Sequence, residues 1–88
     1  EYTDTMTTNQ DTRHIYSIAA EIHTLWPKPY FGAVPYIQAM RCLSDITDMY
    51  GMDSADSIVR YFLANASTWR GEDARRIKAE LRKMIGSK

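Results

Sequence analysis

The segment DTRHIYSIAAEIHTLWP, residues 11–27, decides the fold class of the chain. Its apolar residues recur at steps of three and four positions, which places them on one face of an α-helix: Ile15, Ile18, Ile22 and Leu25 or Trp26. Asp11 or Thr12 can cap the start of this helix, because a short side-chain oxygen accepts a bond from a free backbone N–H. Pro27 forces its end. The segment therefore predicts a helix with one buried face.

A second helix is predicted from Pro35 to about Tyr50, because the residues of this stretch separate into an apolar and a polar side at about 100° per residue. Proline suits a first helical position, and Gly51 fits the left-handed residue that closes a helix. Ile37 lies within the polar arc and is expected to be exposed. Cys42 lies at the edge of the apolar stripe and is expected to be a buried structural thiol. The predicted core side consists of Tyr36, Ala39, Met40, Leu43, Ile46, Thr47 and Tyr50.

Two further helices are predicted in the C-terminal half. Asp53 can cap the first of them, and residues 67–71 break the pattern before the second begins at Glu72. Their buried stripes are Ala55, Ile58, Val59, Phe62, Leu63 and Ala66 in one helix and Ala74, Ile77, Leu81 and Ile85 in the other. The chain is therefore predicted to be all-α, a compact bundle of three to four short helices. Residues 13–86 would form a single helical domain, and residues 1–12 a flexible arm or a remnant of expression or processing.

The charges of the chain balance in total but not along the sequence. The 88 residues carry 11 Lys and Arg and 11 Asp and Glu, which excludes a uniformly basic protein that coats phosphate. The formal charge is −3 over residues 1–26, −1 over residues 27–69 and +4 over residues 70–88. No apolar run approaches the roughly 20 residues of a membrane span, so no membrane contact is expected. The single cysteine cannot form an internal disulfide, which favours a reducing compartment such as the cytoplasm.

No arrangement of residues typical of an enzyme or a metal site occurs in the sequence. The HExxH, CxxC and GxSxG motifs are missing, and the four glycines are too scattered to cradle a phosphate. His14 and His23 point to opposite sides of the first helix, about 180° apart, and cannot bind one metal ion together. We therefore expect no catalytic residues, no metal and no cofactor.

Four aspartates flank the predicted turn at Gly51, and these are Asp45, Asp48, Asp53 and Asp56. The alternating oxygen ligands of a calcium-binding loop are absent, and two of the four carboxylates cap or stabilise a helix start. We interpret the group either as an acidic patch for a basic partner or as a solvated acidic corner.

The last predicted helix concentrates positive charge. Its basic residues could contact the phosphates of a nucleic acid if several of them shared one face, and the candidates are Arg70, Arg75, Arg76, Lys78, Arg82 and Lys83. Glu72 lies four residues before Arg76, and Glu80 lies three residues before Lys83. Some of these cations are therefore expected to have local partners. The alternatives to a nucleic-acid contact are a solvated outer face and the acidic surface of a protein.

Aromatic residues also lie outside the predicted helical stripes. Tyr30, Phe31 and Tyr36 occupy an irregular connection, where aromatic side chains either close the end of a core or anchor a protein interface. Trp69 continues the stripe of the third helix, which favours burial, whereas Tyr61 lies off that stripe, which favours exposure. The candidate protein-binding residues are Asp45, Asp48, Asp53, Asp56, Arg60, Tyr61, Trp69 and Arg70.

Four segments of the sequence carry a resemblance to a family: YFGAVPY at residues 30–36, YG and DSA within 50–55, YFLANASTWRG at 61–71 and ARRIK at 74–78. Over about residues 13–85 the chain resembles a family of short, uncharacterised proteins encoded by phages and prophages. The resemblance implies a bacterial host cell as the setting and brings no catalytic residues with it. Small accessory proteins of this class often act by binding, which is an inference from the class alone.

These observations lead to two functional hypotheses. The first is a small accessory protein that binds a protein partner, for example a host defence enzyme or a nucleic-acid enzyme. The alternative is a nucleic-acid-binding accessory factor that uses the basic C-terminal helix. A homodimer is compatible with both.

Overall fold

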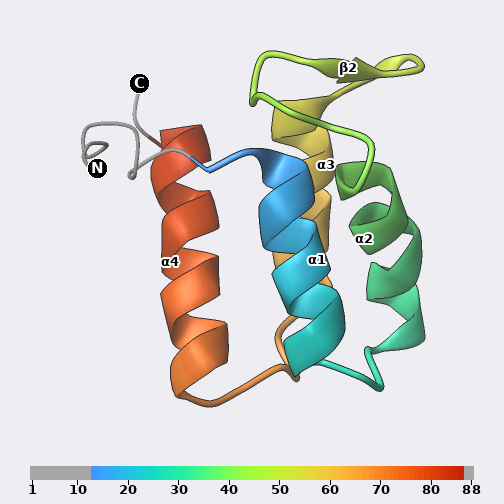
Figure 1. Cartoon of the computed structure of the whole chain (residues 1–88). Helices are drawn as coiled ribbons and strands as arrows, with labels where there is room; N and C mark the ends of the chain where they lie inside the picture. Colours follow the sequence, from blue (N-terminus) through green and yellow to red (C-terminus); the bar gives the residue numbers. More distant parts are fainter. Residues whose placement is uncertain (1–12, 87–88) are drawn as a thin grey trace.

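The computed structural model describes residues 13–86, so the arm predicted at residues 1–12 lies outside the described residues. Within this range the chain forms four α-helices and one small β-hairpin (Figure 1). The helices are α1 (Ile15–Leu25), α2 (Val34–Met40), α3 (Ala55–Ala64) and α4 (Glu72–Gly86), and the 3₁₀ turn η2 (Phe31–Ala33) precedes α2. The strands are β2 (Met49–Tyr50) and β3 (Asp53–Ser54). The predicted all-α bundle is confirmed for the described part of the chain, with the hairpin as an addition.

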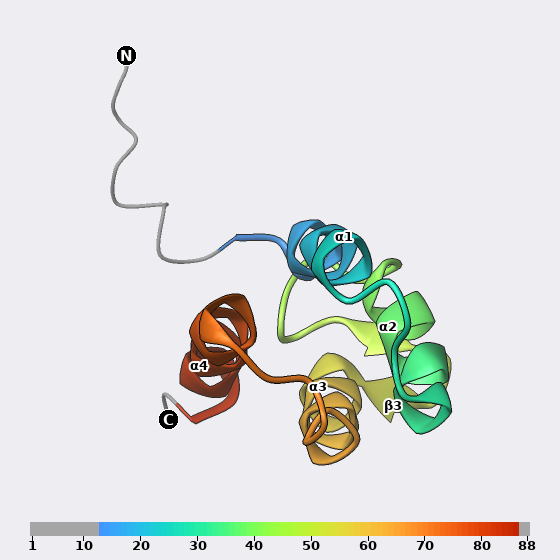
Figure 2. The ribbon, with the colours of Figure 1, turned by 90° about the horizontal axis from the view of Figure 1, so that it is seen from below.

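The four helices stand at the corners of one bundle (Figure 2). Each helix packs on the next in the order α1, α2, α3 and α4, and α4 closes the ring by packing on α1. The hairpin lies at the end of the bundle where α3 begins (Figure 1). Burial of each large apolar side chain stabilises the fold by about 1.5–3 kcal/mol. The largest fully buried side chains are Phe62, Ile15, Ile18, Ile22, Met40, Leu43, Ile77, Leu81 and Val59.

The helix α1 begins at Ile15, with His14 at its N-cap and no side-chain cap bond from that residue; Asp11 and Thr12, the predicted caps, lie outside the described residues. The free backbone N–H groups of its first turn are bound by the loop after α2 instead. The N–H of Ile15 donates to the carbonyl of Ser44 at 3.0 Å, and the next N–H donates to the carbonyl of Leu43 at 2.8 Å. A backbone segment distant in sequence therefore satisfies the first turn of α1.

The end of α2 at Met40 comes well before the predicted end near Tyr50. Just after α2, backbone N–H groups bind carbonyls three residues back, which tightens the chain into a turn. The carboxylate of Asp48 then accepts bonds from the backbone N–H groups of Ser44 at 2.9 Å and Asp45 at 3.0 Å. Short polar side chains that bind nearby backbone compete with a helix. This competition, together with the use of the loop carbonyls at the start of α1, explains the early end.

Several burial predictions for this region are wrong. Ile37, predicted to be exposed, is 6% exposed and belongs to the core. It is buried because α2 packs on both α1 and α3. Cys42, predicted to be buried, is free and exposed, because it lies in the turn after α2 and no longer follows the helical spacing. Thr47 and Tyr50, which the same spacing placed on the core side, are exposed for the same reason.

The hairpin occupies the place of the missing helical turns. It is antiparallel, and Met49 pairs with Ser54 while Tyr50 pairs with Asp53. Gly51 has a φ of 62°, so the left-handed conformation predicted for it is present. It serves a tight turn between two strands, however, and does not close a helix.

The first turn of α3 is capped by Ser54, one residue after the predicted Asp53. Ser54 Oγ accepts a hydrogen bond from the N–H of Ser57 at 3.1 Å. We expect Ser54→Ala to lower the free energy of unfolding by about 1 kcal/mol, measured by urea denaturation. The matched control is Ser67→Ala, since Ser67 is exposed and makes no hydrogen bond within residues 13–86. Equal effects of the two substitutions would contradict the capping role.

Aromatic side chains close the end of the bundle opposite the hairpin. Trp69, in the connection from α3 to α4, is 5% exposed. Its ring stacks on Trp26 with centroids 5.3 Å apart and planes 8° apart, and Trp26 meets Phe62 edge-on at 6.4 Å. The predicted burial of Trp69 is confirmed. The prediction that Trp69 is also a contact residue for a partner is therefore wrong, because its side chain is inside the protein.

Candidate functional site

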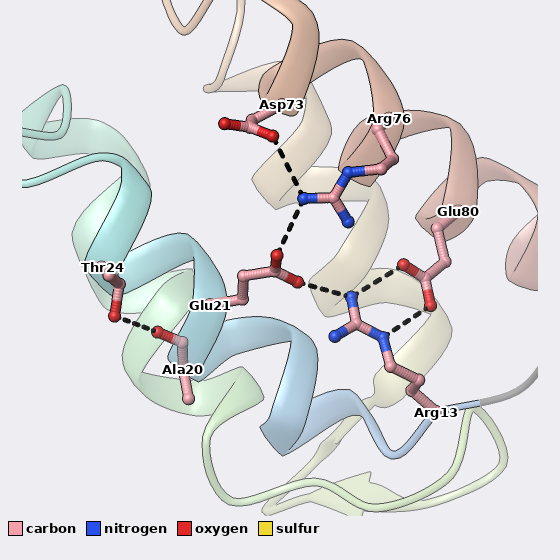
Figure 3. Close-up of polar contacts among 7 residues, drawn as sticks. All are labelled: Arg13, Ala20, Glu21, Thr24, Asp73, Arg76 and Glu80. Carbon is pink, nitrogen blue, oxygen red and sulfur yellow. Dashed lines mark hydrogen bonds and ion pairs between the residues drawn. The ribbon is translucent and has the colours of Figure 1, made fainter. Parts of the chain in front are cut away.

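A network of ion pairs joins α1 to α4 (Figure 3). Arg13, just before α1, donates two hydrogen bonds to Glu80 of α4, at 2.9 and 3.0 Å. Glu21 of α1 lies between two guanidinium groups, 2.8 Å from Arg13 Nη2 and 2.8 Å from Arg76 Nη2. Arg76 also lies 3.3 Å from a carboxylate oxygen of Asp73. Four of these five charged side chains connect α4 to α1 and the residues before it, and Asp73 pairs with Arg76 within α4.

The network favours the charged forms of Arg13, Glu21 and Arg76. The hydrogen bonds with Glu80 raise the pKa of Arg13 above its ordinary value, although partial burial opposes the shift. The hydrogen bond from Arg76 lowers the pKa of Glu21 against the effect of burial, and the contact with Arg13 lowers it further. Glu21 in turn raises the pKa of Arg76. Arg76, a predicted nucleic-acid contact, is instead paired with Glu21 and Asp73.

Two local ion pairs predicted within α4 do not form. Arg76 binds Glu21 and Asp73 in place of Glu72, and Glu80 binds Arg13 in place of Lys83. The physical reason is that this side of α4 faces α1, which supplies better-placed partners. Lys83 is exposed and forms no ion pair within residues 13–86.

The side of α4 away from this network carries a row of basic residues. Arg75, Lys78 and Arg82 follow at steps of three and four, which places them on one face, and Arg70 lies just before the helix. Lys78 Nζ donates to the carbonyl of Trp69 at 2.6 Å. Burial lowers the pKa of Lys78, and the nearby charges of Arg82 and Arg70 lower it further. The basic flank is the name used below for Arg70, Arg75, Lys78 and Arg82.

Four aromatic side chains of η2, α2, α3 and the residue before η2 form two ring pairs. The ring centroids of Tyr30 and Phe31 are 4.9 Å apart, and the two residues are 45% and 79% exposed. Tyr36 of α2 meets Tyr61 of α3 at 5.6 Å, and Tyr61 is 52% exposed. Gly32 allows Tyr30 to lie close, because a Cβ there would be 2.6 Å from the tyrosine ring and 2.9 Å from a side-chain oxygen at the end of α3. The aromatic surface is the name used below for Tyr30, Phe31, Tyr36 and Tyr61.

The exposure predicted for Tyr61 is confirmed. The predicted protein-binding residues do not include Tyr30, Phe31 and Tyr36, because aromatic residues in a loop can equally close a core. Phe31 does not close a core here, since its side chain is exposed. The sequence signal for them is the crowding of three aromatics and a proline into residues 30–36. The contact between Tyr36 and Tyr61 has no local signal, because it joins segments that are distant in sequence.

Three of the four candidate aspartates have local structural partners. The backbone N–H groups of Asp45 and the residue before it bind the carboxylate of Asp48 and lower its pKa. Asp45 Oδ1 in turn accepts a bond from a backbone N–H at 3.4 Å, and Asp56 forms an ion pair with Arg60 at 2.8 Å. Asp53 is exposed in β3. These local roles favour the solvated acidic corner over a patch for a basic partner.

Arg60 and Tyr61 are neighbours in sequence but point to different sides of α3. Arg60 Nη2 donates to the carbonyl of Ile85 in α4 at 3.4 Å, whereas Tyr61 packs on Tyr36 of α2. The two candidate protein-binding residues therefore do not form one contact patch. Only Tyr61 belongs to the aromatic surface.

The described residues offer neither a metal site nor a membrane-spanning helix, and no similar protein was found. Within residues 13–86, no group of three or more histidine, cysteine, aspartate or glutamate side chains could hold a metal ion. No helix in this range combines the length and the apolar character needed to cross a lipid bilayer. Comparison of the chain with family models, curated proteins and solved structures found no match. The aromatic surface and the basic flank are the two features of the described residues that offer side chains to a binding partner.

Proposed function

We propose that this chain is a small accessory protein of phage or prophage type that binds a partner protein in the bacterial cytoplasm. The single observation that carries the proposal is the aromatic surface. Host defence enzymes and nucleic-acid enzymes are the proposed classes of partner. The proposal assigns no catalytic residue and no cofactor.

The aromatic surface has the composition of the centre of a protein interface. Tyrosine and phenylalanine each bury about 150–250 Å² of surface when covered, which is a large apolar contribution per residue. Tyrosine is also enriched among the residues that dominate binding energy. Exposed apolar groups that lie together mark interaction sites, whereas scattered ones are ordinary. The two ring pairs, Tyr30 with Phe31 and Tyr36 with Tyr61, support the binding proposal on this ground.

The rings of this surface hold one another in place. Tyr30 packs over Gly32 and contacts Phe31, while Tyr36 packs on Tyr61 across two helices. A partner would therefore meet side chains that have already lost part of their rotamer freedom. Binding to such a surface loses less conformational entropy than binding to freely rotating side chains.

We expect Tyr61→Ala to weaken binding of the partner by at least about tenfold, which corresponds to about 1.4 kcal/mol. The variant should stay folded, because the side chain is half exposed. The matched control is Met52→Ala, which removes an apolar side chain that is 94% exposed but lies in the hairpin turn. Affinity for the captured partner, measured by surface plasmon resonance, should be unchanged in the control. Equal losses in both variants would contradict a role specific to the aromatic surface.

The partner can be captured with a photo-crosslinking amino acid, benzoylphenylalanine, in place of Phe31. The control position is His23, which is exposed on α1. In a bacterial host lysate we expect one protein crosslinked from position 31, absent from position 23 and lost when Tyr61→Ala is added. A crosslink only between two copies of the chain, with a dimer seen by light scattering, would overturn the proposal in favour of self-association. So would the absence of any crosslink that depends on Tyr61.

A further inference from the structure

The basic flank lies apart from the aromatic surface, because α4 and α2 stand at opposite corners of the bundle (Figure 2). The geometry points to a second binding activity on this flank: contact with the phosphate backbone of a nucleic acid, without selectivity for base sequence. The inference does not rest on the proposed protein partner. It concerns Arg70, Arg75, Lys78 and Arg82 and leaves out Arg76 and Lys83.

The spacing of the row matches a nucleic-acid strand. At a rise of about 1.5 Å per residue, the helix axis advances about 10.5 Å from Arg75 to Arg82. One strand of a DNA duplex presents a phosphate about every 3.4 Å along its axis. The row therefore spans the rise of about three phosphates. Arg70 extends it beyond the first turn of α4.

The carboxylates of α4 are mostly kept away from this row. Asp73 and Glu80 are bound to Arg76 and Arg13 on the side that faces α1. Glu72, exposed in the first turn, is the remaining acidic residue of the helix. The flank therefore presents positive charge that the fold does not neutralise, even though the whole chain has a formal net charge of zero.

The cations of the flank are held near one another against their mutual repulsion. Arg82 lies one helical turn after Lys78, and Lys78 Nζ binds the carbonyl of Trp69, the residue before Arg70. In this position the charges of Arg82 and Arg70 add to burial in lowering the pKa of Lys78. An anionic polymer laid across the flank would relieve this repulsion. The bond from Lys78 to the carbonyl of Trp69 also fixes one member of the row before any ligand arrives.

Phosphate fits this flank better than the carboxylates of an acidic protein. Three of the four cations are arginines, whose planar guanidinium binds the paired oxygens of phosphate and of carboxylate alike, so the spacing of the row decides between them. A regular row also suits a polymer whose charges are evenly spaced. Backbone phosphates carry no sequence information, so a contact made through them is independent of base sequence.

The test is fluorescence anisotropy of a labelled DNA duplex of mixed sequence, titrated with the full chain between about 50 and 200 mM salt. For three to four phosphate contacts, log K should fall against log salt with a slope of about −2.7 to −3.6. The double variant Arg75→Gln/Arg82→Gln should bind at least about tenfold more weakly, with a slope smaller by about 1.8. Duplexes of unrelated sequence should bind alike.

The matched control is Lys28→Gln/Arg41→Gln, which removes the same charge from exposed positions that form no ion pair within residues 13–86. An equal loss of affinity in this control would overturn the inference, because the net charge alone would then explain binding. So would the absence of any anisotropy change with the unaltered chain at about 50 mM salt. If polyglutamate of equal charge competes as well as unlabelled DNA, the flank is a site for acidic proteins and the nucleic-acid assignment is wrong. Should the double variant lose its helical circular dichroism, the salt slope of the unaltered chain still decides.

Discussion

Trp69→Ala is expected to lower the free energy of unfolding by about 3–5 kcal/mol, because it leaves a cavity where a large buried ring was. The indole is 5% exposed and stacks on Trp26. It lies in the connection from α3 to α4, so its removal uncovers one end of the core. Small domains have total stabilities of about 5–15 kcal/mol, so this one change removes a large part of the margin.

The measurement is urea or thermal denaturation followed by circular dichroism, with Tyr61→Ala as the control for loss of an aromatic ring. Tyr61 is 52% exposed, and its substitution should lower the free energy of unfolding by less than about 1 kcal/mol. For Trp69→Ala the melting temperature should fall by at least about 12 °C. Similar effects of the two substitutions would contradict the view that Trp69 closes the core and Tyr61 belongs to the surface.

Apolar spacing predicts α1, α3 and α4 correctly, because each of these helices buries one face against the shared core. The same rule fails for α2, which is buried on two sides and therefore includes Ile37 in the core. The early end of α2 has a partial signal in the sequence, since Asp45 and Asp48 are residues of a type whose side chains bind nearby backbone in turns, as both do here. The part with no local signal is the hydrogen bond that the N–H of Ile15 donates to the carbonyl of Ser44, because it depends on the tertiary fold.

For the candidate site, the sequence predicts where the charges are but not which of them remain available. Arg76 and Arg82 look equivalent in the sequence of α4. The fold separates them, because Arg76 turns to Glu21 of α1 and Arg82 stays exposed on the other side. The same holds for the aromatic surface, in which Tyr36 and Tyr61 meet only through the packing of α2 on α3.

Arg13→Gln is expected to lower the free energy of unfolding by about 1–2 kcal/mol at neutral pH. The change removes two hydrogen bonds with Glu80 and the contact with Glu21, and it leaves these two carboxylates without their shared cation. Hydrogen bonds to charged groups contribute about 1.5–3 kcal/mol each when they are shielded from water. The side chain of Arg13 is 34% exposed, so screening by solvent reduces that contribution.

This loss of stability should shrink as the pH falls. The neighbouring arginines, Arg76 first and then Arg13, lower the pKa of Glu21 below its ordinary value of 4.5. A carboxylate of this kind stabilises the fold fully above its unfolded pKa, and the stabilisation disappears as the pH falls through the lower folded pKa. The unaltered chain should therefore lose stability as the pH falls below 4.5, the ordinary pKa of Glu21. Arg13→Gln should lose less, because part of the stabilisation is already absent.

Urea denaturation of both proteins from about pH 7 to about pH 3 measures this difference. Arg41→Gln is the matched control, because Arg41 is exposed and forms no ion pair within residues 13–86. It should leave both the stability and its pH dependence unchanged. If the stability difference between Arg13→Gln and the unaltered chain stays constant over this range, Arg13 acts through the packing of its aliphatic stem and not through its charge. If the difference becomes smaller as the pH falls, the ion pairs hold α4 against α1. The same ion pairs turn Arg76 and Glu80 toward α1, so the basic flank faces solvent.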